Sequence, residues 1–316
     1  SNAKVQIKIK SNHSAALCAL FLKEYPYIFI INATMCTSCF TVPTITVQLL
    51  CTAVALMYGQ RAVPKSFKWT KRIIFGITAL ASLLLIVLGI FLLVLSTNDD
   101  LRRRSFANFC SKNGKQSEAL DEFRCSILEK SDVSGKVLEF GPGPGTNFKC
   151  FQNSTAASAI QEYVAVEPNP YFHELLHNEK RERDLNFPLD FVGIKGEDVD
   201  VSEGSFDVVI ATHVLCSVDF PEVVLANAER ALKPGGTFVF FEHVYAEYQT
   251  KMWYLQNLIA PIQYIVGDGC RFQDTEEILR RKFASQFDID VTTFDAPMPL
   301  FLSFVKPHIM GLAIKK

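Results

Sequence analysis

A glycine-rich segment at residues 137–146 carries the clearest chemical signal in the sequence. It reads Val-Leu-Glu-Phe-Gly-Pro-Gly-Pro-Gly-Thr and begins as a short apolar run, which predicts a strand entering a turn. Glycines at such a turn let the backbone approach a ligand closely, and a following helix would offer free N–H groups. A dinucleotide fingerprint would place its third small residue at Thr146, but the third glycine here is Gly145. The two prolines also remove N–H donors, so the turn favours a ligand that needs no phosphate cradle.

Acidic residues lie at the ends of three successive predicted strands. Glu139 ends the first, Glu167 ends the second, and Glu197 with Asp198 follows the third. A carboxylate at the end of the second strand is the usual partner of ribose hydroxyls, because it accepts two hydrogen bonds. The set suits a ligand with a cation, a diol and an exocyclic amine. S-adenosylmethionine has all three groups, and we predict it as the cofactor.

The elements that must position these residues follow an alternating pattern of short apolar runs and amphipathic stretches from about residue 105 onward. This rhythm predicts an α/β fold with a doubly wound, parallel sheet. Helices are expected at residues 117–130 and 221–232. Strands are expected at residues 136–140, 163–166, 190–194, 206–211 and 237–241, and two further strands near residues 288–293 and 308–314.

The first third of the chain has a different physical character. Residues 73–96 contain no charge and no proline. As a helix they would span roughly 36 Å, against about 30 Å of bilayer hydrocarbon, and cations flank both ends. A second apolar stretch is broken by Pro26 and Pro43, so residues 42–58 form either a marginal second span or an interfacial segment. We therefore expect a membrane-associated region at residues 1–104 and a globular domain at 105–316.

The net charge of −1 is a cancellation between these two parts. Residues 1–104 carry twelve Lys and Arg against three Asp and Glu, whereas residues 105–316 carry twenty against thirty. The chain as a whole is not a polycation, so we expect no nucleic-acid partner. Five Lys and Arg in residues 61–72 place that loop in the cytosol by the positive-inside rule. A single span or a hairpin would then put the globular domain on the opposite side, whereas an interfacial or re-entrant anchor would leave it in the cytosol.

The nine cysteines are scattered and odd in number, which indicates reduced thiols. Cys36 and Cys39 have the spacing of a redox or zinc motif, but no second pair or histidine lies nearby in the sequence, so we expect no metal site. We interpret Cys216 and Cys270 as small buried apolar residues rather than nucleophiles. Asn153 begins a glycosylation sequon. A glycan on Asn153 in cells would therefore show that the globular domain lies on the lumenal side of the membrane.

The strand-end residues, together with Ser205-Phe206-Asp207 and the turn at residues 232–236, resemble the class I S-adenosylmethionine-dependent methyltransferases over residues 106–316. A closer resemblance is to the membrane-anchored methyltransferase-like protein 7 family, the alkyl thiol S-methyltransferases. It is carried by the strings at residues 167–170, 213–218, 241–244, 268–270 and 306–309. Members of that family commonly have Gly-Cys-Gly-Thr-Gly at the first loop, where this chain has two prolines.

The resemblance implies a Rossmann-like, seven-stranded methyltransferase sheet with helices on both faces, preceded by a hydrophobic helical membrane anchor. It implies cofactor-binding roles for the strand-end residues. A thiol attacks well only as a thiolate, so a base would help, and three histidines are candidates through their imidazole chemistry near neutral pH. The aromatic residues of the region 251–271 indicate a cover over the substrate. The cofactor-binding residues would be Glu139, Gly141, Gly143, Gly145, Glu167, Pro168, Glu197, Asp198 and Thr212, and the catalytic candidates His213, His243 and His308.

The predicted activity is methyl transfer from S-adenosyl-L-methionine to a small lipophilic acceptor, an alkyl thiol by the resemblance. Three alternatives remain: an O- or N-methyltransferase acting on a lipid or quinone, a catalytically inactive membrane or lipid-droplet interaction protein, and a nicotinamide-dependent oxidoreductase. The resemblance also implies attachment to the endoplasmic reticulum and lipid droplets. Because the cofactor is made in the cytosol, we expect the catalytic domain to face the cytosol, against the charge count, and to act as a monomer.

Overall fold

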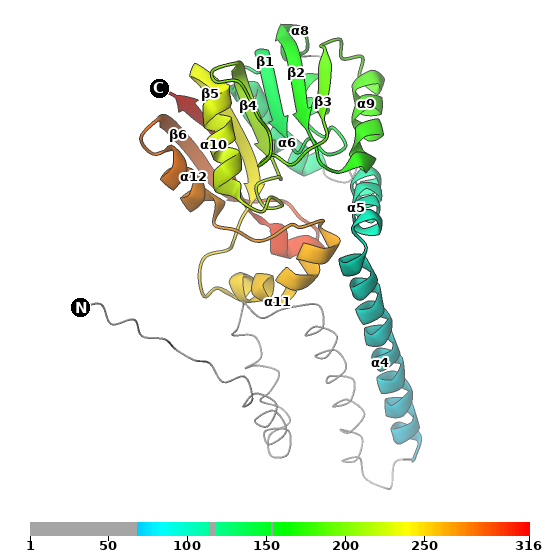
Figure 1. Ribbon diagram of the computed structural model, residues 1–316. Helices are drawn as coiled ribbons and strands as arrows, with labels where there is room; N and C mark the ends of the chain where they lie inside the picture. The colour runs from blue at the N-terminus through cyan, green and yellow to red at the C-terminus, as the bar shows by residue number, and fades with distance from the viewer. Residues whose placement is uncertain (1–67, 114–117, 153) are drawn as a thin grey trace, which may run out of the picture. The chain divides into compact units, whose positions relative to one another are not determined.

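The computed structural model describes residues 68–113, 118–152 and 154–316, and the chain divides into two compact units, residues 1–93 and 94–316. The second unit is built on a seven-stranded sheet in the order β3-β2-β1-β4-β5-β7-β6 (Figure 1). The strands are β1 (Gly135–Phe140), β2 (Ile160–Val166), β3 (Leu189–Val192), β4 (Phe206–Thr212), β5 (Leu232–His243), β6 (Phe287–Asp295) and β7 (Pro307–Lys315).

Five strands, β1 to β5, are parallel, and β7 pairs antiparallel to both β5 and β6. The chain runs outward from β1 through β2 to β3, and then returns to place β4 on the other side of β1. Parallel strands need crossover connections, which here carry the helices that cover the sheet. The point between β1 and β4 is a topological switch point, where open α/β sheets bind their ligands at the carboxyl ends of the strands.

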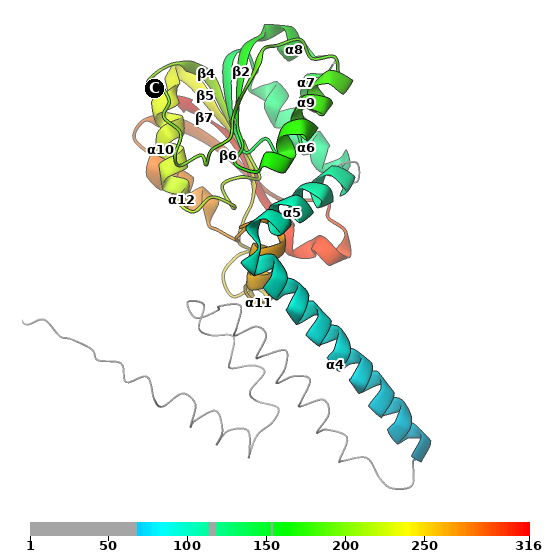
Figure 2. The ribbon, with the colours of Figure 1, turned by 45° about the vertical axis from the view of Figure 1, so that its right-hand side comes forward.

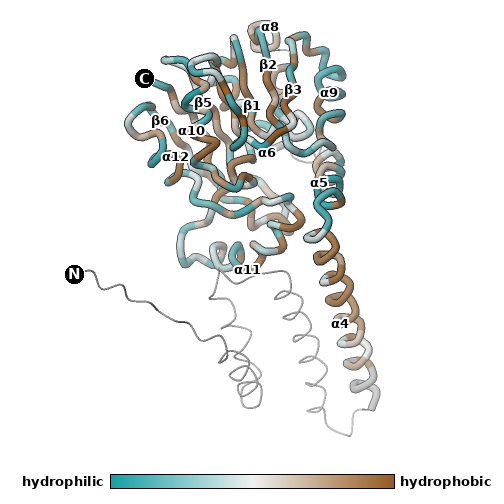
Figure 3. The backbone as a smooth tube through the Cα atoms, viewed as in Figure 1, coloured by the Kyte–Doolittle hydropathy of each residue, from teal (hydrophilic) through white to brown (hydrophobic). Residues whose placement is uncertain are grey.

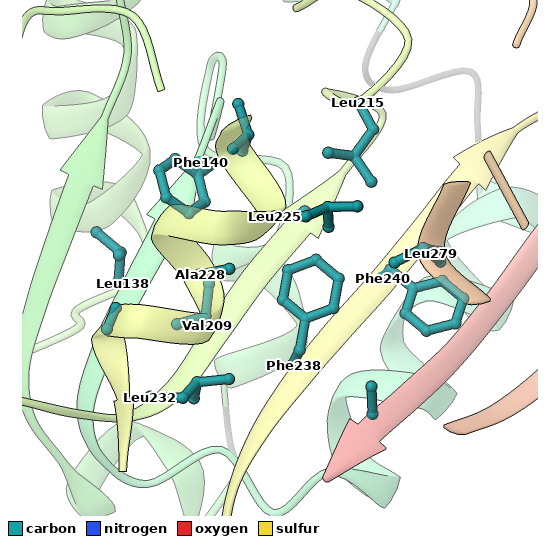
Figure 4. Close-up of a cluster of buried hydrophobic side chains, with 14 of the residues drawn as sticks. Leu138, Phe140, Val209, Leu215, Leu225, Ala228, Leu232, Phe238, Phe240 and Leu279 are labelled. Atoms are coloured by element: carbon teal, nitrogen blue, oxygen red, sulfur yellow. The ribbon is translucent and has the colours of Figure 1, made fainter. Parts of the chain in front are cut away.

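The helices form a layer on each face of the sheet, as Figure 2 shows. On one face, α10 (Pro221–Ala231) and α12 (Thr275–Phe283) pack on alternate strand residues such as Phe238 and Phe240 (Figure 4). On the other face, α6 (Glu118–Lys130), α7 (Phe148–Phe151) and α9 (His173–Glu182) bury a second cluster around Tyr163. The remaining elements of this unit are α5 (Asp99–Asn113), α8 (Ala156–Ala159), η4 (Pro170–Phe172), α11 (Lys251–Val266) and η5 (Leu300–Val305).

The predicted Rossmann-like sheet with helices on both faces is confirmed, and all seven predicted strands are present. The sheet is mixed rather than wholly parallel, because β7 enters between β5 and β6 with reversed direction.

The prediction of reduced thiols is wrong for one pair, since Cys125 of α6 and Cys150 of α7 form a disulfide. The two cysteines lie 25 residues apart in the sequence, and the packing of α6 against α7 brings them together.

Helix α4 (Lys68–Thr97) begins in the first unit, and its last residues belong to the second. Its segment Phe75–Thr97 is long and apolar enough to cross a membrane, and only 17% of its most apolar window is buried (Figure 3). Exposed apolar side chains such as Phe75, Leu80 and Leu84 suit lipid rather than water. The predicted span at residues 73–96 therefore coincides with a helix of the structure. The predictions for residues 42–58, Cys36, Cys39 and Asn153 lie outside the described residues.

Candidate functional site

A cavity of about 410 Å³ lies where the parallel strands end. Its walls are the segments that follow β1, β2, β3 and β4, together with α5 and the residues after α11. The parallel strands β1 to β4 bring these segments to one edge of the sheet, so residues far apart in the sequence meet there. Of the predicted site residues, the cavity is lined by Gly141, Gly143, Glu167, Pro168, Glu197, Thr212 and His213.

The three glycines of the turn after β1 have positive φ angles and three different surroundings. A Cβ at Gly141 would lie 2.4 Å from Cγ2 of Val214, so this position admits only glycine. A Cβ at Gly143 would meet nothing within 4 Å, and the backbone there faces the open cavity. Gly145 does not line the cavity, and a Cβ there would lie 3.0 Å from Cδ1 of Leu176 in α9. The third glycine thus serves helix packing, and the first two shape the ligand turn.

Glu167 is the acidic residue that the structure brings directly into the cavity wall. Its carboxylate accepts hydrogen bonds from the backbone N–H of Gly143 at 3.0 Å and of Asn169 at 2.8 Å, and it is 5% exposed. Burial raises the pKa of Glu167 to about 7, although both hydrogen bonds oppose the shift. Hydroxyl groups of a ligand would find here a fixed acceptor at the end of β2.

Glu139 lies beneath the cavity and does not line it. Its carboxylate accepts hydrogen bonds from the Tyr163 hydroxyl and from the side-chain amide of Asn147, which also donates to the Thr212 hydroxyl at 2.9 Å. Burial raises the pKa of Glu139 to about 7, against the effect of these donors. Glu139 therefore reaches the cavity wall through Asn147 and Thr212. Asn147 is a functional candidate that sequence reasoning missed, although its place in the helix turn after the glycines was a signal.

The three candidate histidines form one group of neighbouring rings, in which His243 and His308 are buried and the half-buried His213 alone lines the cavity. Nε2 of His213 is 3.0 Å from Nε2 of His308, and Nε2 of His243 is 3.0 Å from Sγ of Cys270. Burial, the nearby His308 and Arg124 hold the pKa of His213 well below its usual range. Burial likewise lowers the pKa of His308 to about 3. Both imidazoles are therefore neutral near pH 7.

The tautomers of this pair follow from the hydrogen bonds. Nδ1 of His308 lies 3.0 Å from the backbone carbonyl of Lys306, which can only accept, so this nitrogen carries the proton. Nε2 of neutral His308 is then an acceptor, and Nε2 of His213 must donate to it. Nδ1 of His213 is left as a proton acceptor beside the cavity. His213 also has a φ of 54°, a left-handed conformation that non-glycine residues rarely adopt outside turns and functional sites.

Glu197 and Asp198 have separate positions. Glu197 lines the cavity, but one of its carboxylate oxygens accepts the N–H groups of Asp219 at 2.7 Å and Phe220 at 3.2 Å and so shapes the entry to α10. Asp198 is exposed and lines a different groove, beside Lys136 at the start of β1. The structure therefore brings Glu197, and not Asp198, to the same cavity as Glu167.

Helix α5 forms a wall of the cavity that sequence reasoning did not foresee. Arg102 pairs with Asp99 at 2.7 Å and with Asp268 at 3.0 Å, and all three side chains line the cavity. The side-chain amide of Asn169 donates to Asp268 and to the backbone carbonyl of Arg103, both at 3.1 Å. In the sequence these arginines are the cations that follow the apolar segment, and in the structure Arg102 and Arg103 line this cavity. Two aspartates directly before the run were the signal for this second role.

The aromatic cover expected at residues 251–271 is only partly present. Tyr264 lines the cavity, and the Arg271 guanidinium lies over its ring at 4.9 Å. Phe272 is buried against His243 and does not reach the cavity. Trp253 stacks edge-on with Tyr254, whose side chain is largely exposed, as are others on α11. Helix α11 thus contributes one ring to the site, and several of its other apolar side chains, among them Tyr254, Leu255 and Leu258, are exposed.

The fold and the cavity define a class I methyltransferase. The methyltransferase domain family profile matches residues 113–289. The human thiol S-methyltransferases TMT1B and TMT1A are each 35% identical to this chain, over 64% of the chain and 81% of each relative. The chain therefore belongs to the methyltransferase family that includes these proteins, and it is an S-adenosylmethionine-dependent methyltransferase.

Solved structures support the same fold. The YcgJ protein of Bacillus subtilis matches with a TM-score of 0.51 and 14% identity, over 62% of this chain and 99% of its own. A Haloferax volcanii methyltransferase, solved with the Trm112 activator, matches with a TM-score of 0.52 and 13% identity, over 67% and 97%. The predictions of the family, the enzyme class and the cofactor are thus confirmed.

The buried carboxyls make the stability of the cofactor-free enzyme depend on pH. Unfolded, Glu139 and Glu167 would titrate near ~4.3, whereas both have a pKa of about 7 in the folded domain. Between these values the folded state holds protons that the unfolded state has released, so stability falls as pH rises from ~4.3 to 7 and levels off above. Urea denaturation of the full chain in detergent, at a series of pH values, measures this slope.

The slope of unfolding free energy against pH can be tested with a buried-site variant and a matched control. Glu139→Gln should make the slope shallower, because one of the three buried carboxyls with a raised pKa (Glu139, Glu167 and Glu242) is gone, whereas Glu174→Gln on the exposed face of α9 should leave it unchanged. An equal slope in all three proteins would show that the buried carboxyls do not titrate in this range.

Proposed function

We propose that this enzyme methylates the thiol of a small lipophilic acceptor. The observation that carries the proposal is the 35% identity to two human thiol S-methyltransferases, over 81% of their length. The cavity is consistent with such an acceptor, because apolar side chains of Phe106, Val214 and Val218 line it beside His213. A water-poor, apolar site favours methyl transfer from a sulfonium, since charge is lost as the reaction proceeds.

The strand-end residues would hold the cofactor, which supplies an electrophilic methyl group on its sulfonium sulfur. Glu167 would accept both ribose hydroxyls, and the network of Glu139, Asn147 and Thr212 would receive the methionine ammonium, a proposal supported by their hydrogen bonds at this edge of the sheet. Gly143 leaves open space where a side chain would otherwise project, and Gly141 lets the turn lie close against Val214. The residues present therefore fit S-adenosylmethionine without a phosphate cradle.

A test of the cofactor site uses Glu167→Gln. The amide retains one acceptor oxygen but loses the charge, so the Kd for S-adenosylmethionine should rise roughly 10- to 100-fold, because a hydrogen bond to a charged group contributes about 1.5–3 kcal/mol. Isothermal titration calorimetry of the full chain in detergent measures it. The exposed control Glu174→Gln should bind as the wild type does. Wild-type affinity in Glu167→Gln would remove Glu167 from the cofactor site.

His213 is the group that we propose to receive the acceptor's proton. A thiol attacks well only as a thiolate, so a proton acceptor beside the bound thiol assists the reaction. Neutral His213 offers Nδ1 for this role, and His308 positions it through the contact between their Nε2 atoms. His308 and His243 do not line the cavity, so we assign them no direct contact with the acceptor.

The activity test incubates the full chain in detergent with S-adenosylmethionine and a small alkyl thiol, and detects the methyl thioether by mass spectrometry. His213→Asn keeps a residue that tolerates positive φ and should lower kcat roughly 10²- to 10⁴-fold, the range for loss of a general base. The affinity of His213→Asn for the cofactor should stay within a few-fold of the wild type. The control is His177→Asn, at an exposed position of α9, which should leave kcat unchanged. An alcohol or amine methylated in preference to every thiol offered would overturn the proposed acceptor.

An exposed apolar surface supports an acceptor that partitions into membranes. Residues 252–267 and 296–305 contain no charged residue, and α11 packs against both η5 and α5. Leu258 of α11 and Leu300 and Phe301 of η5 are 62%, 88% and 71% exposed. Such a patch, with interfacial tyrosines such as Tyr254, suits the headgroup region of a bilayer. We propose attachment to the endoplasmic reticulum or lipid droplets through α4 and this surface.

The observations disagree about the side of the membrane on which the methyltransferase domain lies. We propose a cytosolic methyltransferase domain, because S-adenosylmethionine is made there, whereas the Cys125–Cys150 disulfide and the positive-inside count favour the lumen. Peptide mapping of the protein purified from cells should find Asn153 without glycan, as expected of a cytosolic domain. A glycan on Asn153 would place the domain in the lumen.

A further inference from the structure

Two cysteines and a histidine from distant parts of the chain converge inside the methyltransferase domain. Cys216 lies in the loop after β4, His243 ends β5, and Cys270 follows α11. The Sγ atoms of the two cysteines are 3.6 Å apart, and Nε2 of His243 is 3.0 Å from Sγ of Cys270. All three ligand atoms lie within 4.8 Å of one another, and the side chains are buried.

We propose that Cys216, His243 and Cys270 bind a zinc ion. Zinc in proteins has Zn–S distances of about 2.3 Å and Zn–N distances of about 2.0–2.1 Å in a tetrahedron, which sets two such sulfurs about 3.8 Å apart and a sulfur and nitrogen about 3.6 Å apart. The observed S–S separation is close to this value. Nε2 of His243 lies 3.0 Å from Sγ of Cys270, so the ring would have to move by about half an ångström to reach the sulfur–nitrogen distance of a zinc site. Two thiolates and an imidazole form a soft donor set that selects zinc over magnesium or calcium.

Zinc binds cysteine as the thiolate, so a bound divalent ion would balance the two negative charges that the buried site then carries. Glu242, the neighbour of His243, is fully buried, and its Oε2 has no hydrogen-bond partner among the described residues, nor has Nδ1 of His243. Buried polar atoms without partners mark places where a water or an ion belongs.

The surroundings of the cluster resemble the outer shell of a metal site. The side-chain amide of Gln263 donates to Sγ of Cys270 at 3.3 Å, a contact that would orient and stabilise a metal-bound thiolate. The Ser217 hydroxyl lies 3.5 Å from Sγ of Cys216, and Ser217 lines the cofactor cavity. Three protein ligands leave a fourth position for water or another small donor. The proposed ion would thus join the loop after β4 to the loop after α11, both of which line the cavity.

The first measurement is the metal content of the full chain, purified in detergent without a histidine tag or chelators. Inductively coupled plasma mass spectrometry should find about one zinc per chain. Replacement by Co²⁺ should give the near-ultraviolet charge-transfer absorption of thiolate-bound cobalt. This spectrum reports the ligands in the wild-type protein and does not depend on a variant that folds.

The variants locate the site. Cys216→Ser and His243→Gln should each lower zinc occupancy at least tenfold and weaken the cobalt absorption, with folding checked by circular dichroism. Cys110→Ser, which changes a half-buried cysteine of α5 outside the cluster, should keep full occupancy.

Two results would overturn the proposal. One is wild-type protein that takes up neither zinc nor cobalt at micromolar concentrations. The other is a Cys216–Cys270 disulfide, found by peptide mapping of protein alkylated before unfolding, which would make the pair a redox couple instead. Because these readouts do not involve methyl transfer, the metal site can fail while the proposed thiol methyltransferase activity stands, and the reverse also holds.

Discussion

The buried carboxylate of Glu167 is the interaction on which the architecture of the site depends. It accepts N–H groups from Gly143 and Asn169, and so fixes the turn after β1 to the end of β2. The Asn169 side chain in turn bonds to Asp268 and to the backbone of Arg103, which extends the network to α5 and to the loop after α11. A carboxyl buried at this edge costs free energy unless such donors converge on it. The same convergence makes it a fixed acceptor for a ligand.

A second carboxylate organises the opposite wall. Glu242 at the end of β5 accepts the N–H groups of Val214 and Leu215, both at 2.9 Å, immediately after the left-handed residue His213. These bonds hold the backbone in a conformation that the sequence around His213 would not adopt alone. Residue 213 therefore faces the cavity because β5, a later strand of the chain, fixes the loop that carries it.

Much of the fold was predictable because its signals are local. The apolar run at Val208, Val209 and Ile210 specifies a strand buried on both faces, and the glycines after Phe140 specify a turn. Once the strands are parallel, the residues that follow them must meet at one edge, so Glu167 and Thr212 could be placed near each other from sequence alone. The direction of β7 was not predictable in this way, since periodicity does not encode strand orientation.

The remaining features arise from contacts between distant segments. The disulfide joins Cys125 to Cys150 because α6 packs on α7, and the Cys216–His243–Cys270 cluster forms only when β4, β5 and α11 are all in place. Asp198 and Glu197 are neighbours in the sequence, yet they line different cavities, because the chain turns here on its way from β3 to β4. Sequence spacing could nominate these residues, but only the packed backbone decides which of them share a site.

Helix α5 extends the site beyond the domain that the family shares. The match to the methyltransferase family begins at residue 113, so α5 lies before the common domain, yet Arg102 and Phe106 form part of the cavity wall. Helix α4 ends at Thr97, and α5 begins at Asp99. The wall is therefore built from sequence that directly follows the apolar helix. A variant that lacks the apolar helix must still contain α5 to retain the Arg102–Asp268 pair, so the cavity is not a property of the common domain alone.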